Sequence, residues 1–262
     1  MKTKLFLFLI LLSVWSCKPN SLDTDGLKGK VKSVTTKTYE VDEYDEYETG
    51  DLLSSVVHEF DEDGYSKKVT NYDHNEDMTS YSEYTYTDGI CTAWYHHYKD
   101  PELKSSKETI FENGKPVRVE YDEKSSHRKD KFEFDGNKIV YEVLYDEDGD
   151  KKSSSRYTYN DDDLLIKYVV NGRDNSYKME REWSDDGLVL SYKFKSTYFQ
   201  EKCTYEYDED NHCVKMTRKS DGEKEITRYK YLEYDEEGNW TKRLISVDGE
   251  PSSIEEREIA YY

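Results

Sequence analysis

Apolar and polar side chains alternate with a period of two along most of the chain. In one stretch Leu190, Tyr192 and Phe194 share one face, while Lys193 and Lys195 share the other. This alternation is typical of a β-strand with one buried face. It also predicts two further buried faces, made of Ile139, Tyr141, Val143 and Tyr145 in one strand and Leu164, Ile166, Tyr168 and Val170 in another. Helical periodicity of comparable length is absent, so the pattern predicts an all-β protein.

A turn motif recurs between these strands, consisting of an aromatic residue, acidic or amide residues and then glycine or asparagine. The spacings are 26, 25, 23, 25, 24, 24 and 27 residues between the leading aromatic residues Phe60, Tyr86, Phe111, Phe134, Tyr159, Trp183, Tyr207 and Tyr234. A second set of turn sequences, such as Asp146 to Gly149 and Asn171-Gly172, lies midway between them. A fixed period of this length indicates stacked supersecondary units, and two turns per period indicate one hairpin per unit.

The turn residues predict a specific backbone geometry. Aspartate or asparagine at the first position caps the backbone, and glycine or asparagine at the fourth tolerates positive φ. We therefore expect type I turns followed by a bulge. The fold class that follows is an antiparallel meander of about 16–18 strands in hairpin repeats of about 25 residues. Curling this meander into a barrel-like or spiral sheet would bury its tyrosine-rich face and remove exposed edges.

The first seventeen residues have the pattern of an export signal. Lys2 and Lys4 precede an apolar run from Leu5 to Leu12, and Ser16 stands directly before Cys17. This ending resembles the lipobox of bacterial lipoproteins, in which the cysteine is lipidated after cleavage. The resemblance divides the chain into a signal peptide (1–16), a lipidated Cys17 with a tether (17–26) and a repeat domain (27–262). The alternative is an ordinary secretory signal with a chance cysteine.

Composition limits the choice of partners. The chain has 262 residues, of which 34% are hydrophobic and 37% charged, with a net charge of −20. Such values would indicate disorder, but 26 tyrosines among 15% aromatic residues argue for a folded β protein. The acidity repels polyanions at long range, so we expect no nucleic-acid partner, and we expect membrane contact only through the lipid on Cys17.

The turn sequences resemble a known family. Tyr145 to Gly149 and Tyr234 to Gly238 both read Tyr-Asp-x-x-Gly, which resembles the YD or Rhs repeat. With the opening at 26–31 and the lipoprotein signal, residues 27–262 are also similar to small Gram-negative lipoproteins of unknown function with a porin-like barrel. The resemblance implies an outer membrane lipoprotein, on either the periplasmic or the surface side. The chain is too short to be a toxin-enclosing shell, so that role is not implied.

Aromatic side chains are the best candidates for a binding site. Aromatic rings can stack on sugars or anchor a protein partner. The candidates, which could instead fill the buried face, are Trp94, Tyr95, Tyr98, Trp183, Tyr231 and Trp240. We expect no catalytic residue and no cofactor, because the sequence lacks His-Glu-x-x-His, Gly-x-Ser-x-Gly and phosphate-loop motifs.

Acidic turn residues and cysteines are two further candidates for metal binding or disulfide formation. The acidic turns contain weak candidates for Ca²⁺ ligands, namely Asp61, Asp63, Asp146 and Asp148, although the turns themselves demand the same residues. Cys203 and Cys213 flank one turn, and a four-residue turn would place Cys203 opposite Met216 with Cys213 on the other face. That placement argues against a disulfide between them, but the oxidising compartment of an exported protein leaves it as an open alternative.

Together these observations predict a lipid-anchored envelope protein with a non-catalytic binding or scaffolding role toward a glycan or protein. Two alternatives stay open. One is a hydrolase acting on glycans or peptides, with its carboxylates hidden among the many acidic residues. The other is a purely structural envelope component.

Overall fold

A computed structural model describes residues 26–262, except for 43–46, 88–89, 100–103, 113–114, 124–125, 137, 147 and 174–175. The predicted signal peptide, the lipidation site Cys17 and most of the tether lie outside the described residues. None of the described residues belongs to a helix long and apolar enough to cross a membrane.

The described chain forms 18 β-strands. Their bounds are β1 Val31–Val41, β2 Thr49–Phe60, β3 Ser66–Tyr72, β4 Met78–Thr87, β5 Ile90–Tyr98, β6 Lys104–Glu112, β7 Lys115–Glu123, β8 Ser126–Asp135, β9 Lys138–Tyr145, β10 Lys151–Tyr159, β11 Leu165–Gly172, β12 Ser176–Trp183, β13 Val189–Ser196, β14 Gln200–Tyr207, β15 Cys213–Ser220, β16 Glu223–Tyr234, β17 Trp240–Val247 and β18 Glu250–Tyr261.

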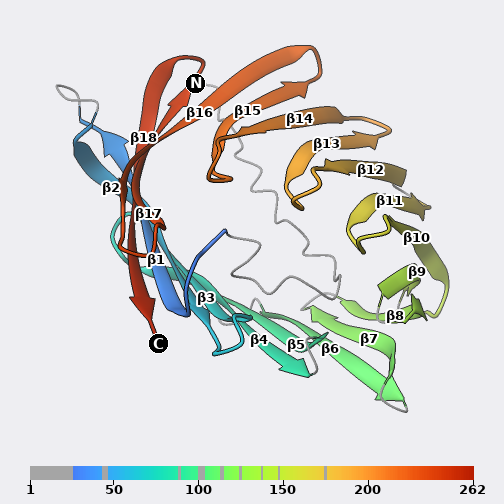
Figure 1. Ribbon diagram of the computed structural model, residues 1–262. Coiled ribbons are helices and arrows are strands. Elements are labelled where there is room, and N and C mark those ends of the chain that lie inside the picture. The colour runs from blue at the N-terminus through green and yellow to red at the C-terminus, as the bar shows by residue number, and fades with distance from the viewer. Residues whose placement is uncertain are drawn as a thin grey trace.

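Each strand pairs antiparallel with the next one along the chain. The first strand also pairs with the last, so Val34 of β1 lies opposite His58 of β2 on one side and Ile259 of β18 on the other. The strands therefore surround a common centre (Figure 1). The predicted all-β antiparallel meander with a barrel-like form is confirmed.

The turn at Asp61 shows the geometry predicted for the repeat. The Asp61 N–H donates to the Tyr65 carbonyl at 2.9 Å, and the Gly64 N–H donates to the Asp61 carbonyl at 3.0 Å. Gly64 has a φ of 84°, and the pairing of β2 with β3 shifts register between Glu59 and Phe60. The same pair of hydrogen bonds recurs in the turns that begin at Asp146, Asn160, Ser184, Asp208 and Asp235.

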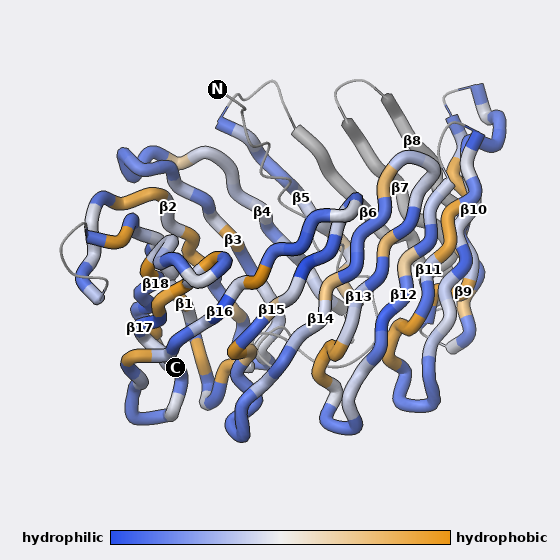
Figure 2. The backbone as a smooth tube through the Cα atoms, turned by 90° about the horizontal axis from the view of Figure 1, so that it is seen from above, coloured by the Kyte–Doolittle hydropathy of each residue, from blue (hydrophilic) through white to orange (hydrophobic). Residues whose placement is uncertain are grey.

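The sheet has two chemically different faces. Cross-strand pairs such as Tyr157 with Tyr168 and Tyr192 with Cys203 belong to one face, which we call the tyrosine face. Tyr168 and Tyr192 are each only 9% exposed. Residues between them point the other way, onto what we call the lysine face, and the resulting alternation runs along the strands in Figure 2. Sequence alternation correctly assigned Tyr192 and Phe194 to the face opposite Lys193 and Lys195.

Bulges changed the buried set in three strands. In β13 the pairing with β12 shifts register at Leu190, which is 41% exposed, so its predicted place on the buried face with Tyr192 is wrong. In β9 the buried residues are Ile139, Glu142 and Leu144, so the predicted burial of Tyr141 and Val143 is wrong. The pairing with β8 shifts register beyond Ile139, and this extra residue reverses the faces that follow. In β11 a similar shift buries Leu165 in place of Ile166, while Tyr168 and Val170 are buried as predicted.

The start of the described chain is clamped to its end. The Lys28 N–H donates to Asn239 Oδ1 at 2.7 Å, and Asn239 Nδ2 donates to the Lys28 carbonyl at 3.0 Å and to the Tyr261 hydroxyl at 2.7 Å. Beside this clamp an apolar cluster contains Leu27, Val31, Val34 and Phe60, with Ile259 and Tyr261 packed against it. Side-chain packing thus reinforces the backbone pairing that joins β1 to β18.

Candidate functional site

A row of aromatic rings follows one face of β5. Trp94, His96 and Tyr98 are two residues apart and so point to the same side of the strand. Their ring centroids are 5.8 Å apart between Trp94 and His96 and 4.4 Å apart between His96 and Tyr98. We call these three residues the aromatic row. Tyr98 at its end is 46% exposed, so part of the row is accessible.

Hydroxyl and amide groups from the two preceding strands lie beside the aromatic row. Ser82 of β4 pairs with His96, and Ser82 Oγ lies 2.7 Å from His96 Nδ1. Ser80 pairs with Tyr98 and accepts a hydrogen bond of 3.1 Å from Asn71 Nδ2 of β3. The aromatic surface therefore has a polar margin made of short, uncharged side chains.

The electrostatics of this region favour uncharged groups. Partial burial lowers the pKa of His96 below its ordinary value, and neighbouring His97 lowers it further. His96 is therefore neutral at pH 7 and can both donate and accept hydrogen bonds. Burial also raises the pKa of the Tyr84 hydroxyl, which lies near Ser82 and Trp94.

This arrangement suits a neutral, partly apolar ligand. Aromatic faces stack on flat surfaces rich in C–H groups, and the adjoining hydroxyl and amide groups supply directional hydrogen bonds. A pyranose ring has both properties, because one face carries C–H groups and its edge carries hydroxyls. Stacking on an aromatic ring needs no proton transfer. The arrangement therefore supports ligand binding and does not require a catalytic reaction.

The other sequence-predicted aromatic residues lie elsewhere. Tyr95 is on β5 but on the opposite face from the aromatic row, and it is 43% exposed. Trp183 ends β12, where its Nε1–H donates to the Leu165 carbonyl at 3.0 Å. The structure thus divides the six candidates among several parts of the ring.

Tyr231 and Trp240 do come together, but in a packed cluster. Their ring centroids are 5.9 Å apart, and Trp240 is only 6% exposed. The Arg257 and Arg243 guanidinium groups lie over the Trp240 ring at 3.6 and 4.2 Å. Burial disfavours the charge on Arg243, but Glu255 at 2.6 Å outweighs burial and raises its pKa.

A recurring hydrogen bond explains why several of these aromatic residues are present. The donor groups of Tyr159, Trp183, Tyr207 and Tyr231 reach the backbone carbonyls of Ile139, Leu165, Val189 and Cys213 at 2.9, 3.0, 2.9 and 2.9 Å. Each bond ties one hairpin to the hairpin before it. Sequence reasoning missed this contact, although the repeated Tyr or Trp, each with a polar hydrogen, was its signal.

The acidic turn residues use their carboxylates to hold the turns. Asp61 Oδ1 accepts the N–H groups of Asp63 and Tyr65 at 3.0 and 2.9 Å, and Asp146 Oδ1 accepts that of Asp150 at 2.7 Å. Asp148 is exposed. Within the described part of the chain, no three His, Cys, Asp or Glu side chains are placed to hold a metal ion.

Cys203 and Cys213 are free thiols. Cys203 lies opposite Arg218 rather than Met216, because a bulge follows Cys213 in β15, so the predicted register was wrong. Burial, followed by the nearby Glu201 charge, raises the pKa of Cys203 to about 11. A protonated thiol of this kind is a poor nucleophile.

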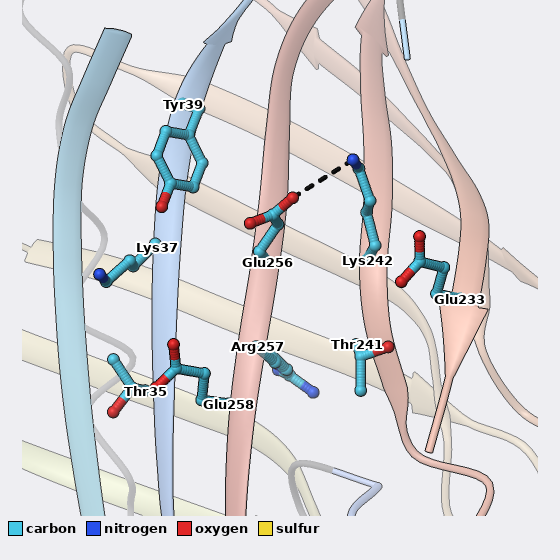
Figure 3. Close-up of a pocket in the computed structure, with 9 residues that line it drawn as sticks. All are labelled: Thr35, Lys37, Tyr39, Glu233, Thr241, Lys242, Glu256, Arg257 and Glu258. Carbon is cyan, nitrogen blue, oxygen red and sulfur yellow. Dashed lines mark ion pairs between the residues drawn. The ribbon is translucent and has the colours of Figure 1, made fainter. Parts of the chain in front are cut away.

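A small pocket lies across β16, β17, β18 and β1 (Figure 3). It has a volume of about 210 Å³ and is lined by Thr35, Lys37, Tyr39, Glu233, Thr241, Lys242, Glu256, Arg257 and Glu258. Lys242 Nζ forms an ion pair with Glu256 at 3.2 Å. The pocket is smaller than the roughly 300 Å³ at which ligand pockets begin, and its mixed charges favour neither sign of ligand.

Comparison with known proteins gives distant similarities. No protein-family model matches the chain. The chain is similar to the tRNA3(Ser)-specific nuclease WapA of Bacillus spizizenii, with 30% identity over 177 residues. That match covers 64% of this chain but 7% of the nuclease.

The solved structures that resemble the chain include two porin-like proteins. The one from Bacteroides uniformis has 10% identity and a TM-score of 0.44, covering 94% of this chain and 99% of that protein. The one from Bacteroides vulgatus has 12% identity and a TM-score of 0.41, covering 88% and 98%. TcdB2-TccC3 without its hypervariable C-terminal region has 12% identity and a TM-score of 0.33, covering 77% of this chain and 15% of that one.

Proposed function

We propose that this protein is a lipid-anchored, non-catalytic binding protein of the bacterial outer membrane and that its partner is a glycan. Cys17 would carry the lipid, and the aromatic row on β5 would bind the sugar. The observation that carries the proposal is the succession of Trp94, His96 and Tyr98 on one face, with ring centroids 5.8 and 4.4 Å apart and with Tyr98 meeting His96 edge-to-face.

The surroundings of the aromatic row support a neutral glycan. Ser82, Ser80 and Asn71 form hydrogen bonds along its margin, and they are uncharged side chains of the kind that bind sugar hydroxyls. His96 adds a neutral ring nitrogen, since its pKa is lowered chiefly by burial. A protein partner would use the same aromatic rings, and the binding experiment below distinguishes the two.

The test is electrophoresis of the full-length protein, solubilised in detergent, through native gels that contain a neutral glucan, mannan or xylan. Wild-type protein should be retarded by at least one polysaccharide. Tyr98→Ala and Trp94→Ala should each weaken that retardation about tenfold, which corresponds to about 1.4 kcal/mol of binding free energy.

Tyr95→Ala is the matched control. Tyr95 lies on the same strand with nearly the same exposure, 43% against 46% for Tyr98, but it points to the other face. This variant should migrate like the wild type. Equal loss in Tyr95→Ala and Tyr98→Ala, or no retardation by any of the three polysaccharides, would overturn the proposal. Circular dichroism of each variant shows whether the sheet is intact.

A further inference from the structure

Four lysines stand directly opposite one another across four neighbouring strands. Lys193 of β13 pairs with Lys202 of β14, Lys202 with Lys219 of β15, and Lys219 with Lys224 of β16. All four are exposed. They lie on the lysine face, since Lys193 alternates with the buried Tyr192. We call these four residues the lysine row.

Lys202 and Lys219 lack the acidic partners that other lysines have, whereas Lys193 lies directly opposite Glu180 of β12. Lys215, also on β15, pairs with Glu206 at 2.6 Å, and Lys178 pairs with Glu180 at 2.5 Å. Among the described residues, none forms an ion pair with Lys202 or Lys219. The chain has 58 acidic residues against 38 basic ones, so a row of four lysines in register departs from its own composition.

Such a row destabilises the sheet when nothing is bound. Like charges placed directly opposite on neighbouring strands repel each other. Positions at which neighbouring side chains repel each other without a compensating contact are typical of functional sites. An anion lying across the four strands would supply the missing compensation.

Most acidic turns are too far away to cancel this charge; the exception is the turn between β15 and β16, where Asp221 is two residues from Lys219. Lys202 lies six residues from Asp208 along β14, which corresponds to about 20 Å at roughly 3.3 Å per residue. The Debye length at physiological ionic strength is about 8 Å. The long-range repulsion expected from the net charge of −20 is therefore screened, and the local field at the row comes from the four lysines together with Glu180, opposite Lys193, and Asp221.

We infer that the lysine row binds a linear anionic glycan that carries a carboxylate on each sugar. Neighbouring strands are about 4.8 Å apart, so the four ammonium groups repeat at that interval over about 14 Å. A polyuronate presents one charge per sugar at a comparable repeat. The row crosses the strands as a single line, with Lys195 of β13 beside it. This shape suits a single extended chain better than a lipid surface, for which a broad basic patch is needed.

This inference does not depend on the proposed sugar site. The lysine row and the aromatic row lie on different strands, β13–β16 against β5. They also belong to opposite faces of the sheet, because the register links Trp94 and His96 to the tyrosine face through successive pairs. Each site can therefore be tested while the other is intact.

The test measures fluorescence anisotropy of a labelled oligogalacturonate long enough to span four strands, at physiological ionic strength, with the full-length protein in detergent. The wild type should bind it but not its fully methyl-esterified form, which has the same backbone without charge. The double variant Lys202→Gln, Lys219→Gln should bind about tenfold more weakly, with a salt slope reduced by about one charge per lysine removed.

The matched control is Lys99→Gln, Lys215→Gln. It removes the same charge from two lysines paired with acids, Asp77 at 3.1 Å and Glu206 at 2.6 Å, and should bind like the wild type. Equal weakening in both double variants overturns the inference, because net charge alone would explain it. So does absence of binding, or tighter binding to anionic vesicles or single-stranded DNA than to oligogalacturonate.

Two further readouts separate this site from the proposed neutral-sugar site. Tyr98→Ala should bind oligogalacturonate normally, and the Lys202→Gln, Lys219→Gln variant should migrate normally in the neutral polysaccharide gels. The same double variant should also melt at a higher temperature than the wild type without ligand, since it removes like-charge repulsion. A lower melting temperature would mean that the row stabilises the sheet, against the inference.

Discussion

Glu142 is a carboxylate buried where the alternation of β9 predicts an outward-facing residue. It is 8% exposed, and the Tyr157 hydroxyl donates to its Oε2 atom at 2.6 Å. Burial raises the pKa of Tyr157, and the Glu142 charge raises it further. The pair is thus a buried charge satisfied by a neutral donor from the next strand, and its partner was not evident from local sequence.

Removing that donor should destabilise the fold. Tyr157→Phe leaves Glu142 buried without its hydrogen bond, and the expected loss is about 1–3 kcal/mol of unfolding free energy. Tyr141→Phe is the control, because that hydroxyl lies on the other face, 3.4 Å from Lys151 Nζ, and its loss should cost little. Urea unfolding followed by circular dichroism measures both. Identical midpoints would show that the Glu142 contact does not stabilise the protein.

The hairpin turns are the elements for which the sequence was most informative. Their hydrogen bonds and positive φ angles depend on residues within five positions, so local chemistry was enough to predict them. Register was harder, because turns such as those at Asp61, Asn160, Ser184, Asp208 and Asp235 each add a bulge whose extra residue reverses the faces beyond it. This effect produced the errors at Val143 and Cys203.

The turn at Ser184 tests this local control. Gly187 has a φ of 79°, and a Cβ atom there would meet nothing within 4 Å. A substitution at this position therefore introduces backbone strain without a steric clash. Gly187→Ala should lower the unfolding free energy by about 1–2 kcal/mol. Gly187→Asn should cost less, because Asn211 occupies the equivalent position with a φ of 68°. Denaturant titration should rank wild type, asparagine and alanine in that order; equal stability of all three variants would contradict the strain argument.

The candidate site shows the same division between local and distant information. Residues an even number of positions apart on a strand share a face, so alternation alone is enough to place Trp94 and Tyr98 on one face. Their neighbours Ser80, Ser82 and Asn71 come from other strands, and only the register of β3, β4 and β5 brings them together.

At the scale of the whole molecule, the ring depends on buried tyrosines. The sequence predicted a curled sheet but left closed and spiral forms open, because the pairing of β1 with β18 joins residues more than 200 positions apart. No local pattern encodes such a contact. What the local pattern does specify is the set of hydroxyl-bearing aromatic residues, which pack between the strands around the ring.

Alkaline pH should therefore unfold the protein. Burial is the main cause that raises the pKa of Tyr207, Tyr229 and Tyr261 to about 12 each, above the ordinary 10.0. A raised pKa favours the neutral form in the folded state, so this stability is complete below about pH 10 and is lost as pH rises toward 12. The midpoint of urea unfolding should fall steeply across that interval.

Tyrosinate absorbance provides the check. Tyr207, Tyr229 and Tyr261, whose pKa values are raised, should ionise above pH 10, together with loss of the β-sheet circular dichroism signal. A single ionisation step near pH 10 with the circular dichroism unchanged would contradict this prediction.

The pairing of β1 with β18 also orders events during folding. Of the described strands β1 emerges first and the twelve residues of β18 emerge after the others, so β1 keeps an unpaired edge until β18 is available. An open strand edge can pair with another chain, and contacts between such distant residues form slowly. Pairing of β18 with β1 therefore completes the ring, and a chain that lacks β18 is left with two unpaired strand edges.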